Sequence, residues 1–295
     1  MGIAPASTAP RRPVGRIPQW GRLVPWWAEA STLRVVTQKW RTLVLFYPVL
    51  DARYGSGLGR QHARRVMGRE ERDVVEAVVA SLPVTVTAWS DGAATLDPLD
   101  IVAIRRPIAS LSSSGAGRWW VGPREVKPEL AEISATGTVY DSVVALWPCD
   151  PGVPQCGWGC TIGPSETTFG AGFSSISTDH WRSLTTDPDP VQGYVHEWLH
   201  QVEAVYRALG LSEAVLPPLH DAASFTSTRP IDEPPFGRSY AEYHDGDASQ
   251  LPAARTWAPW YGDWMTGRLR PIGAVQQADQ PIGLTPGRWS LRSRS

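Results

Sequence analysis

The order of apolar and polar positions along the chain predicts a fold that mixes strands with helices. Residues 41–50 form an almost unbroken apolar run, and residues 141–147 have a similar composition, as in strands that are buried on both faces. Residues 84–89 alternate between apolar and polar side chains with the period of two that is typical of a strand. The small, polar side chains of residues 171–178 predict an exposed strand at the edge of a sheet.

The first helix is expected within residues 61–82, where apolar positions recur every three or four residues. Pro83 is expected to end it, because proline removes a backbone donor and clashes with the preceding turn. The glycine-rich residues 55–59 precede this helix but lack the dinucleotide-binding pattern and the lysine of a phosphate-binding loop. We therefore favour a flexible connection there over a phosphate site.

The second helix is expected within residues 189–210. Asp189 is a good N-cap, Gln192 completes a capping box and Gly210 is a natural C-terminal stop. Apolar side chains at steps of three and four form a stripe that holds this helix inside the protein: Val195, Trp198, Val202, Val205 and Leu209.

The composition allows a full hydrophobic core and excludes several classes of protein. The chain has 295 residues, of which 42% are hydrophobic, so it is not disordered as a whole. The 28 basic and 29 acidic residues leave no positive surplus for nucleic-acid phosphates. The longest apolar stretch, near residues 42–50, is too short to span a membrane. We expect a soluble protein with neither a nucleic-acid nor a membrane partner.

One main domain is expected after an N-terminal arm. Residues 1–35 are rich in proline and tryptophan and have no sustained periodicity, which predicts an irregular arm. Residues 36–295 are expected to form a single domain, with an upper sheet part at 36–210 and a C-terminal part at 211–295. No apolar segment follows the positive charges near the N-terminus, which favours the cytoplasm over secretion.

Three cysteines lie close together in a segment rich in proline and glycine: Cys149, Cys156 and Cys160. An odd number allows either one disulfide with a free thiol or three reduced thiols, so their redox state stays open. A disulfide would also fit a secreted protein. We find no nucleophile-elbow motif, and no histidine is near these cysteines in the sequence, which disfavours a serine or cysteine hydrolase.

The residues that can carry chemistry are concentrated in the second helix, which contains the pattern His-Glu-x-x-His. His196 and His200 are one helical turn apart, so both rings can reach one metal ion from the same face. Glu197 is placed to take a proton from a water molecule that the metal activates. The spacing therefore predicts a metal site with His196 and His200 as ligands and Glu197 as the general base.

This motif resembles that of the zincin class of metallopeptidases, whose active-site helix carries His-Glu-x-x-His. The resemblance covers this helix and one position downstream, and the rest of the chain is similar to the class only in the order of its elements. It implies an α+β, zincin-like fold, in which a twisted mixed sheet with an antiparallel edge strand packs on the active-site helix. An irregular or helical C-terminal part then follows. Residues 171–178 would be the edge strand and would bind an extended peptide by strand addition.

A catalytic zinc site takes three protein ligands, so a third ligand must come from outside the motif. Nineteen residues separate His200 from His220, a separation at which the thermolysin-like zincins have a glutamate. After the helix the chain can turn and return to the metal past the prolines that precede His220. We therefore favour His220 as the third ligand, with Asp221 and His244 as alternatives.

Further residues are expected around the metal. Glu203 lies on the same helix face as the histidines but too far along the axis to join them, which favours an outer carboxylate or an ion pair with Arg207. The resemblance also implies a group that stabilises the oxyanion formed after attack on a carbonyl. Tyr243 and His244 are the favoured residues for this role, and other candidates are Tyr240 and Tyr261.

Together these residues favour a zinc-dependent hydrolase, similar to a peptidase, that cleaves an amide or peptide bond in a peptide or small-molecule substrate. Zn(II) is the expected metal, and Fe(II) is the alternative. One rival function is a non-hydrolytic iron or zinc enzyme that modifies a peptide or a small metabolite. The other is a non-catalytic, zincin-like binding module. The bond that is cleaved and the oligomeric state do not follow from the sequence.

Overall fold

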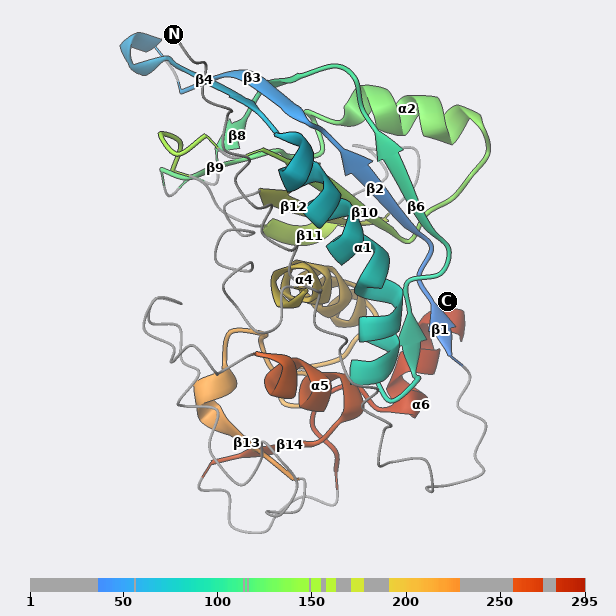
Figure 1. The fold of residues 1–295 in the computed structure, drawn as a ribbon. Helices are drawn as coiled ribbons and strands as arrows, with labels where there is room; N and C mark the ends of the chain where they lie inside the picture. Colours follow the sequence, from blue (N-terminus) through green and yellow to red (C-terminus); the bar gives the residue numbers. More distant parts are fainter. Residues whose placement is uncertain are drawn as a thin grey trace, which may run out of the picture. The chain divides into compact units, whose positions relative to one another are not determined.

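A five-stranded mixed sheet organises the chain (Figure 1). The computed structural model describes residues 37–294 except 56, 114, 116, 149, 155–157, 163–170, 178–190, 229–256 and 273–279. The strand order is β11-β12-β10-β2-β6, and all neighbours are parallel except β11 and β12. The strands are β2 (Thr42–Phe46), β6 (Leu99–Ala103), β10 (Ser142–Trp147), β11 (Trp158–Ile162) and β12 (Ala171–Ser177).

One face of this sheet packs against two helices, α1 (Arg69–Trp89) and α4 (Gln192–Ala208), and a third helix, α5 (Ala258–Thr266), packs on these two. In β2 and β10 every second side chain, such as Val44 and Val144, enters this core because side chains alternate across a strand. In Figure 1, α4 lies between the sheet and α5. The apolar stripe predicted for the second helix faces this core, with Val195, Trp198 and Val202 buried.

The other face of the sheet packs against a smaller three-stranded sheet and a helix. The smaller sheet has the order β4-β3-β7 and contains β3 (Val49–Tyr54), β4 (Gln61–Val66) and β7 (Ile108–Ser110). The helix is α2 (Lys127–Ala135). Leu43 and Val143, the neighbours of the residues that face the helices, point into this second core. Burial on both faces explains why residues 43–46 and 143–147 are continuously apolar.

Short elements complete the described part of the chain. Three pairs of short strands form: β1 (Gln38–Lys39) with β5 (Ala94–Thr95), β8 (Ser112–Ser113) with β9 (Trp119–Trp120), and β13 (Phe225–Ser227) with β14 (Leu269–Pro271). The short helices are η1 (Gly57–Gly59), η2 (Ala222–Ser224), α6 (Pro286–Trp289) and η5 (Ser290–Arg294). The glycine-rich residues 55–59 connect strands β3 and β4, so the helix expected to follow them is absent there.

Helix α1 corrects two predictions. Residues 61–66 form strand β4 rather than the start of a helix, and α1 continues through Pro83 to Trp89, so residues 84–89 are not a strand. The buried side chains of α1 keep helical spacing across the proline: Val75, Val79, Leu82 and Val86. Burying this stripe against the sheet stabilises the helix by more than the one backbone hydrogen bond that proline removes.

The predicted strand at residues 171–178 forms as β12, but it is not an edge strand. It lies between β11 and β10, and all seven of its residues are buried. Its serines are polar because their hydroxyls bond other buried groups: Ser174 contacts helix α4, and Ser175 accepts from the indole of Trp147. The antiparallel strand at this side of the described sheet is β11.

The strand predicted at residues 41–50 is divided into β2 and β3 at Tyr47 and Pro48, and these two strands belong to different sheets. The strand predicted at 141–147 is confirmed as β10. The fold is therefore α+β, as predicted from the sequence. The predicted arm at residues 1–35 lies outside the described residues. Within the described residues, no helix combines the length and the hydropathy that crossing a membrane requires.

Candidate metal centre

Helix α4 lies unusually close to the sheet because two glycines face it. A Cβ atom at Gly159 in β11 would lie 2.3 Å from the backbone oxygen of Glu197 and 2.5 Å from Cβ of His200. A Cβ atom at Gly172 in β12 would lie 2.3 Å from Oε1 of Gln201. Only glycine fits at such distances, so the backbone of β11 runs directly against the His-Glu-x-x-His segment.

A buried polar network fastens α4 to the sheet at the same place. The amide of Gln201, which is fully buried, accepts from the Ser142 hydroxyl at 2.6 Å and donates to the Ser174 hydroxyl at 2.6 Å. Ser174 then donates to the backbone oxygen of Glu197 at 2.8 Å. Because each of these contacts satisfies a buried polar group, the network fixes the rotation of α4 about its axis.

Three histidines lie close together beside α4, two of them on the helix itself. One ring nitrogen each from His196, His200 and His220 lies within 4.8 Å of the other two. The ring centroids of His220 lie 5.0 Å from His196 and 4.8 Å from His200. The two helix histidines are half-buried and His220, in the turn before η2, is exposed. This group could hold a metal ion.

The spacing of the two helix histidines fits tetrahedral coordination. Their Nε2 atoms are 3.1 Å apart. Two nitrogen ligands at about 2.0–2.1 Å from a tetrahedral zinc would be about 3.3–3.4 Å apart. Without a metal ion, one of the two Nε2 atoms must carry a proton for them to approach so closely, and a bound metal ion would remove that requirement.

The opposite nitrogen of each helix histidine has its own partner. Nδ1 of His196 lies 2.9 Å from the hydroxyl of Tyr261 in α5. Nδ1 of His200 lies 3.6 Å from Oε2 of Glu203. Metal-binding histidines commonly have their second nitrogen held by a carboxylate or another acceptor, which keeps the first nitrogen available for the metal. Both helix histidines therefore present Nε2 to the site.

Glu203 takes both roles that the sequence left open for it, because it contacts His200 and also pairs with Arg207 at 3.5 Å. Burial by itself raises the pKa of Glu203, but hydrogen bonding and charge at His200, the N–H of Leu219 and the Arg207 guanidinium together lower it below its ordinary value. Glu203 is therefore an anion next to the histidine group.

Glu197 is buried, with 4% of its surface exposed, and it stands next to His196 in the chain. Burial raises the pKa of its carboxyl group to about 8. A nearby divalent cation favours the ionised carboxylate and so acts in the opposite direction. A buried carboxyl group whose pKa lies near neutrality is suited to accept and return a proton.

The other predicted site residues fall into two groups. Asp221 does not join the histidines within the described residues: its Oδ1 accepts from the hydroxyl of Ser224 at 2.5 Å, next to η2. Tyr243 and His244, predicted to stabilise the oxyanion, lie outside the described residues, as does Tyr240. Of the three cysteines, Cys149 and Cys156 also lie outside them, and only the backbone of Cys160 is described, in β11.

Several of these contacts do not follow from the sequence. Tyr261, one of the candidates for stabilising the oxyanion, contacts His196 through its hydroxyl. Helix α4 begins at Gln192, whose Oε1 accepts from the backbone N–H of Trp257 at 2.8 Å and so ties the starts of α4 and α5 together. Nothing near Gly159 in the sequence signals its contact with α4, since that contact requires the sheet. Asp189, the predicted N-cap, lies outside the described residues.

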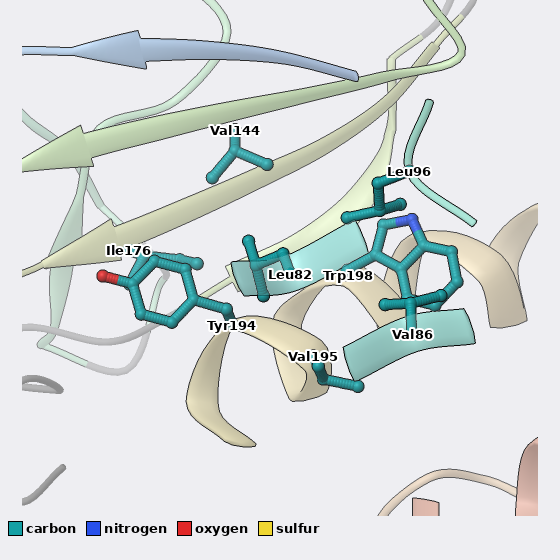
Figure 2. A pocket seen from close by; sticks show the side chains of 8 residues that line it. All are labelled: Leu82, Val86, Leu96, Val144, Ile176, Tyr194, Val195 and Trp198. Carbon is teal, nitrogen blue, oxygen red and sulfur yellow. The ribbon is translucent and has the colours of Figure 1, made fainter. Parts of the chain in front are cut away.

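A separate apolar pocket lies on the other side of α4 (Figure 2). With 3.6 residues per turn, its helix residues Tyr194, Val195 and Trp198 lie opposite His196 and His200. The pocket belongs to the core between α1, α4 and the sheet and is lined by Leu82, Val86, Leu96, Val144, Ile176, Tyr194, Val195 and Trp198. Its apolar lining offers nothing to a metal ion or a polar substrate.

Comparisons of this chain with protein families, curated proteins and solved structures found no match. Any function assigned to this site must therefore be argued from the residues of the site themselves.

Proposed function

We propose that this protein is a zinc-dependent hydrolase of the zincin type that cleaves an amide or peptide bond. The observation that carries the proposal is that one ring nitrogen from each of three histidines lies within 4.8 Å of the others, and that two of these histidines are one helical turn apart with Glu197 next to the first in the sequence. A zinc ion held by these three histidines would have three protein ligands, which is the number typical of a catalytic rather than a structural zinc site.

The protein groups have distinct parts in this mechanism. When bound, Zn(II) supplies Lewis acidity, which polarises a carbonyl group and activates a water molecule. His196, His200 and His220 hold it. The carboxylate of Glu197 takes the proton of the attacking water and passes it to the leaving amine. Burial of Glu197 keeps bulk water away from that proton and raises the pKa of the carboxyl group, which opposes the lowering that a bound cation would cause.

The substrate that fits this arrangement best is an extended peptide. Among the described strands β11 pairs only with β12, so its second edge offers backbone N–H and C=O groups to another strand. Gly159 brings this strand against the His-Glu-x-x-His segment. A peptide added along β11 would therefore lie beside the metal ligands. The strand proposed for this role replaces residues 171–178, which the sequence favoured.

Two features of the fold support the zincin assignment. The mixed sheet carries one antiparallel strand, β11, at its edge among the described strands, and α4 packs on β11 and β12. The third histidine comes from the segment that follows α4, and α5 then returns to contact the helix histidine at position 196. The first of these features, a mixed sheet with an antiparallel edge strand packed on the helix of the motif, is what the resemblance implies, although strand β11 takes the place of residues 171–178.

Replacement of Glu197 by glutamine tests the proposal. Purified chain is assayed for zinc by elemental analysis and for hydrolysis with a library of quenched fluorescent peptides, in parallel with Glu213→Gln, which removes an exposed carboxylate shortly after α4. Glu197→Gln is expected to keep stoichiometric zinc and lose at least about 100-fold in rate, whereas Glu213→Gln keeps both. Full activity in Glu197→Gln, or wild-type chain that binds no transition metal, would exclude the mechanism.

The all-imidazole ligand set supports one other function. Three imidazoles with an open position also suit Fe(II), which would make the protein a non-hydrolytic enzyme acting on a peptide or small metabolite. Elemental analysis of chain purified without added metal, together with oxygen consumption in the presence of Fe(II), separates the two functions. Iron in place of zinc, with intact peptides after incubation, would favour this second function.

A further inference from the structure

Glu203 stands between two of the three proposed metal ligands. It is one helical turn beyond His200 on α4, and 18% of its side chain is exposed. Its Oε2 atom lies 3.6 Å from Nδ1 of His200 and accepts the backbone N–H of Leu219 at 3.4 Å. Leu219 is the residue directly before His220. One carboxylate oxygen therefore contacts the second ligand and the backbone that carries the third.

The turn at His220 is held from two sides. The N–H of Leu219 is bound to Glu203 on α4, and its carbonyl oxygen accepts from the indole of Trp260 on α5 at 2.8 Å. Two residues earlier, the carbonyl oxygen of Pro217 accepts from the indole of Trp264 at 3.0 Å. The two indoles set the distance between the turn and α5, and Glu203 supplies its connection to the metal-binding helix.

We infer that Glu203 is a positioning residue that assembles the metal site, by orienting His200 and by fixing the turn that carries His220. This inference rests on the proposed metal site. A carboxylate beside Nδ1 keeps the proton of His200 on that nitrogen and leaves Nε2 for the metal, and its negative charge makes the imidazole a stronger ligand. Without Glu203, His200 loses the carboxylate that orients it, and the turn of His220 loses its connection to α4 while keeping its two bonds to α5.

The competing explanation is that Glu203 only pairs with Arg207. Such an i,i+4 pair adds little to helix stability and has no reason to change metal affinity. Arg207→Met is therefore a matched control, because it removes the ion pair and leaves the contacts of Glu203 to His200 and Leu219 in place. If the ion pair were the whole role of Glu203, the two variants would behave alike.

Metal binding to the full chain tests this inference. Zn²⁺ is titrated against a chromophoric chelator, and the visible absorption of added Co²⁺ reports tetrahedral coordination, for wild type, Glu203→Gln, Glu203→Ala and Arg207→Met. Zinc binding to Glu203→Ala is expected to be about 10–100-fold weaker. Glu203→Gln keeps an oxygen that can accept from the N–H of Leu219 but removes the negative charge beside His200. Its zinc affinity should therefore fall by a smaller factor than that of Glu203→Ala. Arg207→Met should bind nearly as tightly as wild type.

A double-mutant cycle shows whether Glu203 acts through the third ligand. In a His220→Ala background, Glu203→Ala should lower the zinc affinity by a smaller factor than it does in wild type. The reason is that the turn fixed by Glu203 no longer carries a metal ligand in that background. If Glu203→Ala binds zinc as tightly as wild type, or if Arg207→Met loses as much zinc affinity as Glu203→Ala, the positioning role of Glu203 is overturned. The proposed metal site is unaffected by either result. Wild-type chain that binds neither Zn²⁺ nor Co²⁺ overturns the proposed site and this inference with it.

Discussion

The hydroxyl of Tyr261 lies 2.9 Å from Nδ1 of His196, on the side of the imidazole away from His200. Tyr261 is buried, and its ring is stacked on Trp257 with centroids 6.3 Å apart and contacts Trp89 at 6.1 Å. Because these aromatic contacts hold the ring of Tyr261 in place, they also determine the position of its hydroxyl group beside His196. The orientation of the first proposed ligand therefore depends on a helix 65 residues further along the chain.

Tyr261→Phe should weaken zinc binding by about 10-fold, because His196 loses the partner that keeps its proton on Nδ1 while the aromatic packing stays. A competition titration with a chromophoric chelator measures the change. Tyr140→Phe is the matched control, since it removes a hydroxyl bonded to Asp100 on β6. A Tyr261→Phe protein that binds zinc as tightly as the control would show that Tyr261 has only a packing role.

His220→Ala and Asp221→Asn distinguish the third ligand. Because the His220 ring joins the other two and Asp221 bonds Ser224, His220→Ala should lose zinc at micromolar metal concentrations while Asp221→Asn keeps it. Elemental analysis after dialysis gives the metal content of each. Circular dichroism of both variants checks that the fold is retained. Zinc lost from Asp221→Asn and kept in His220→Ala would reverse the assignment.

Gly159→Ala should disturb the site through the backbone. The added Cβ would meet the Glu197 carbonyl oxygen and Cβ of His200 at distances that no carbon atom tolerates, so β11 and α4 must separate. Overpacking of this kind costs about 1–3 kcal/mol in the free energy of unfolding. Gly59→Ala, where nothing lies near the added carbon, is the control. Chemical denaturation and zinc titration should both separate the two variants, and equal behaviour would mean that β11 moves freely.

Ser174→Ala removes the centre of the network that joins β12 to α4. The Glu197 carbonyl oxygen and the Gln201 amide each lose one buried hydrogen bond, although the amide keeps its bond to the Val143 carbonyl oxygen, so the expected cost is about 0.5–1.5 kcal/mol per bond. Urea unfolding should show this loss, while Ser113→Ala, at an exposed serine, should change the free energy of unfolding by less than about 0.5 kcal/mol. Similar midpoints for the two variants would indicate that water replaces the missing hydroxyl.

The proposed site could be predicted from the sequence to a considerable extent because its central part is local. Helix α4 lies within the predicted residues 189–210, and the four-residue spacing of His196 and His200 places both rings on one face whatever the helix packs against. That His220 lies beside the two helix histidines is harder to predict, because the chain must turn back after nineteen intervening residues. In the structure, one ring nitrogen of His220 nevertheless lies within 4.8 Å of a ring nitrogen of each of the other two histidines. The roles of Glu197 and of the metal stay predictions.

The prediction errors in the fold have a common physical cause. The alternation in residues 84–89 is equally compatible with the end of a helix, and contact with the sheet selects the helix by burying Val86. The small and polar residues of β12 resemble an exposed edge, but they are small because α4 packs closely, and polar because Gln201 requires partners. In each case a short pattern fits two structures, and contacts distant in sequence decide between them.

The sequence by itself determined the mixed α+β class, the amphipathic helix and the pair of histidines one turn apart, because each depends on spacings within a few residues. Only the tertiary structure decided which strand lies beside that helix, which residue completes the histidine group, and which side chains hold the rings. These relationships join residues 16 to 65 positions apart, such as Leu219 with Glu203 and Tyr261 with His196. Such contacts form only when the helices and the sheet bury their apolar faces together, and periodicity along the chain does not record them.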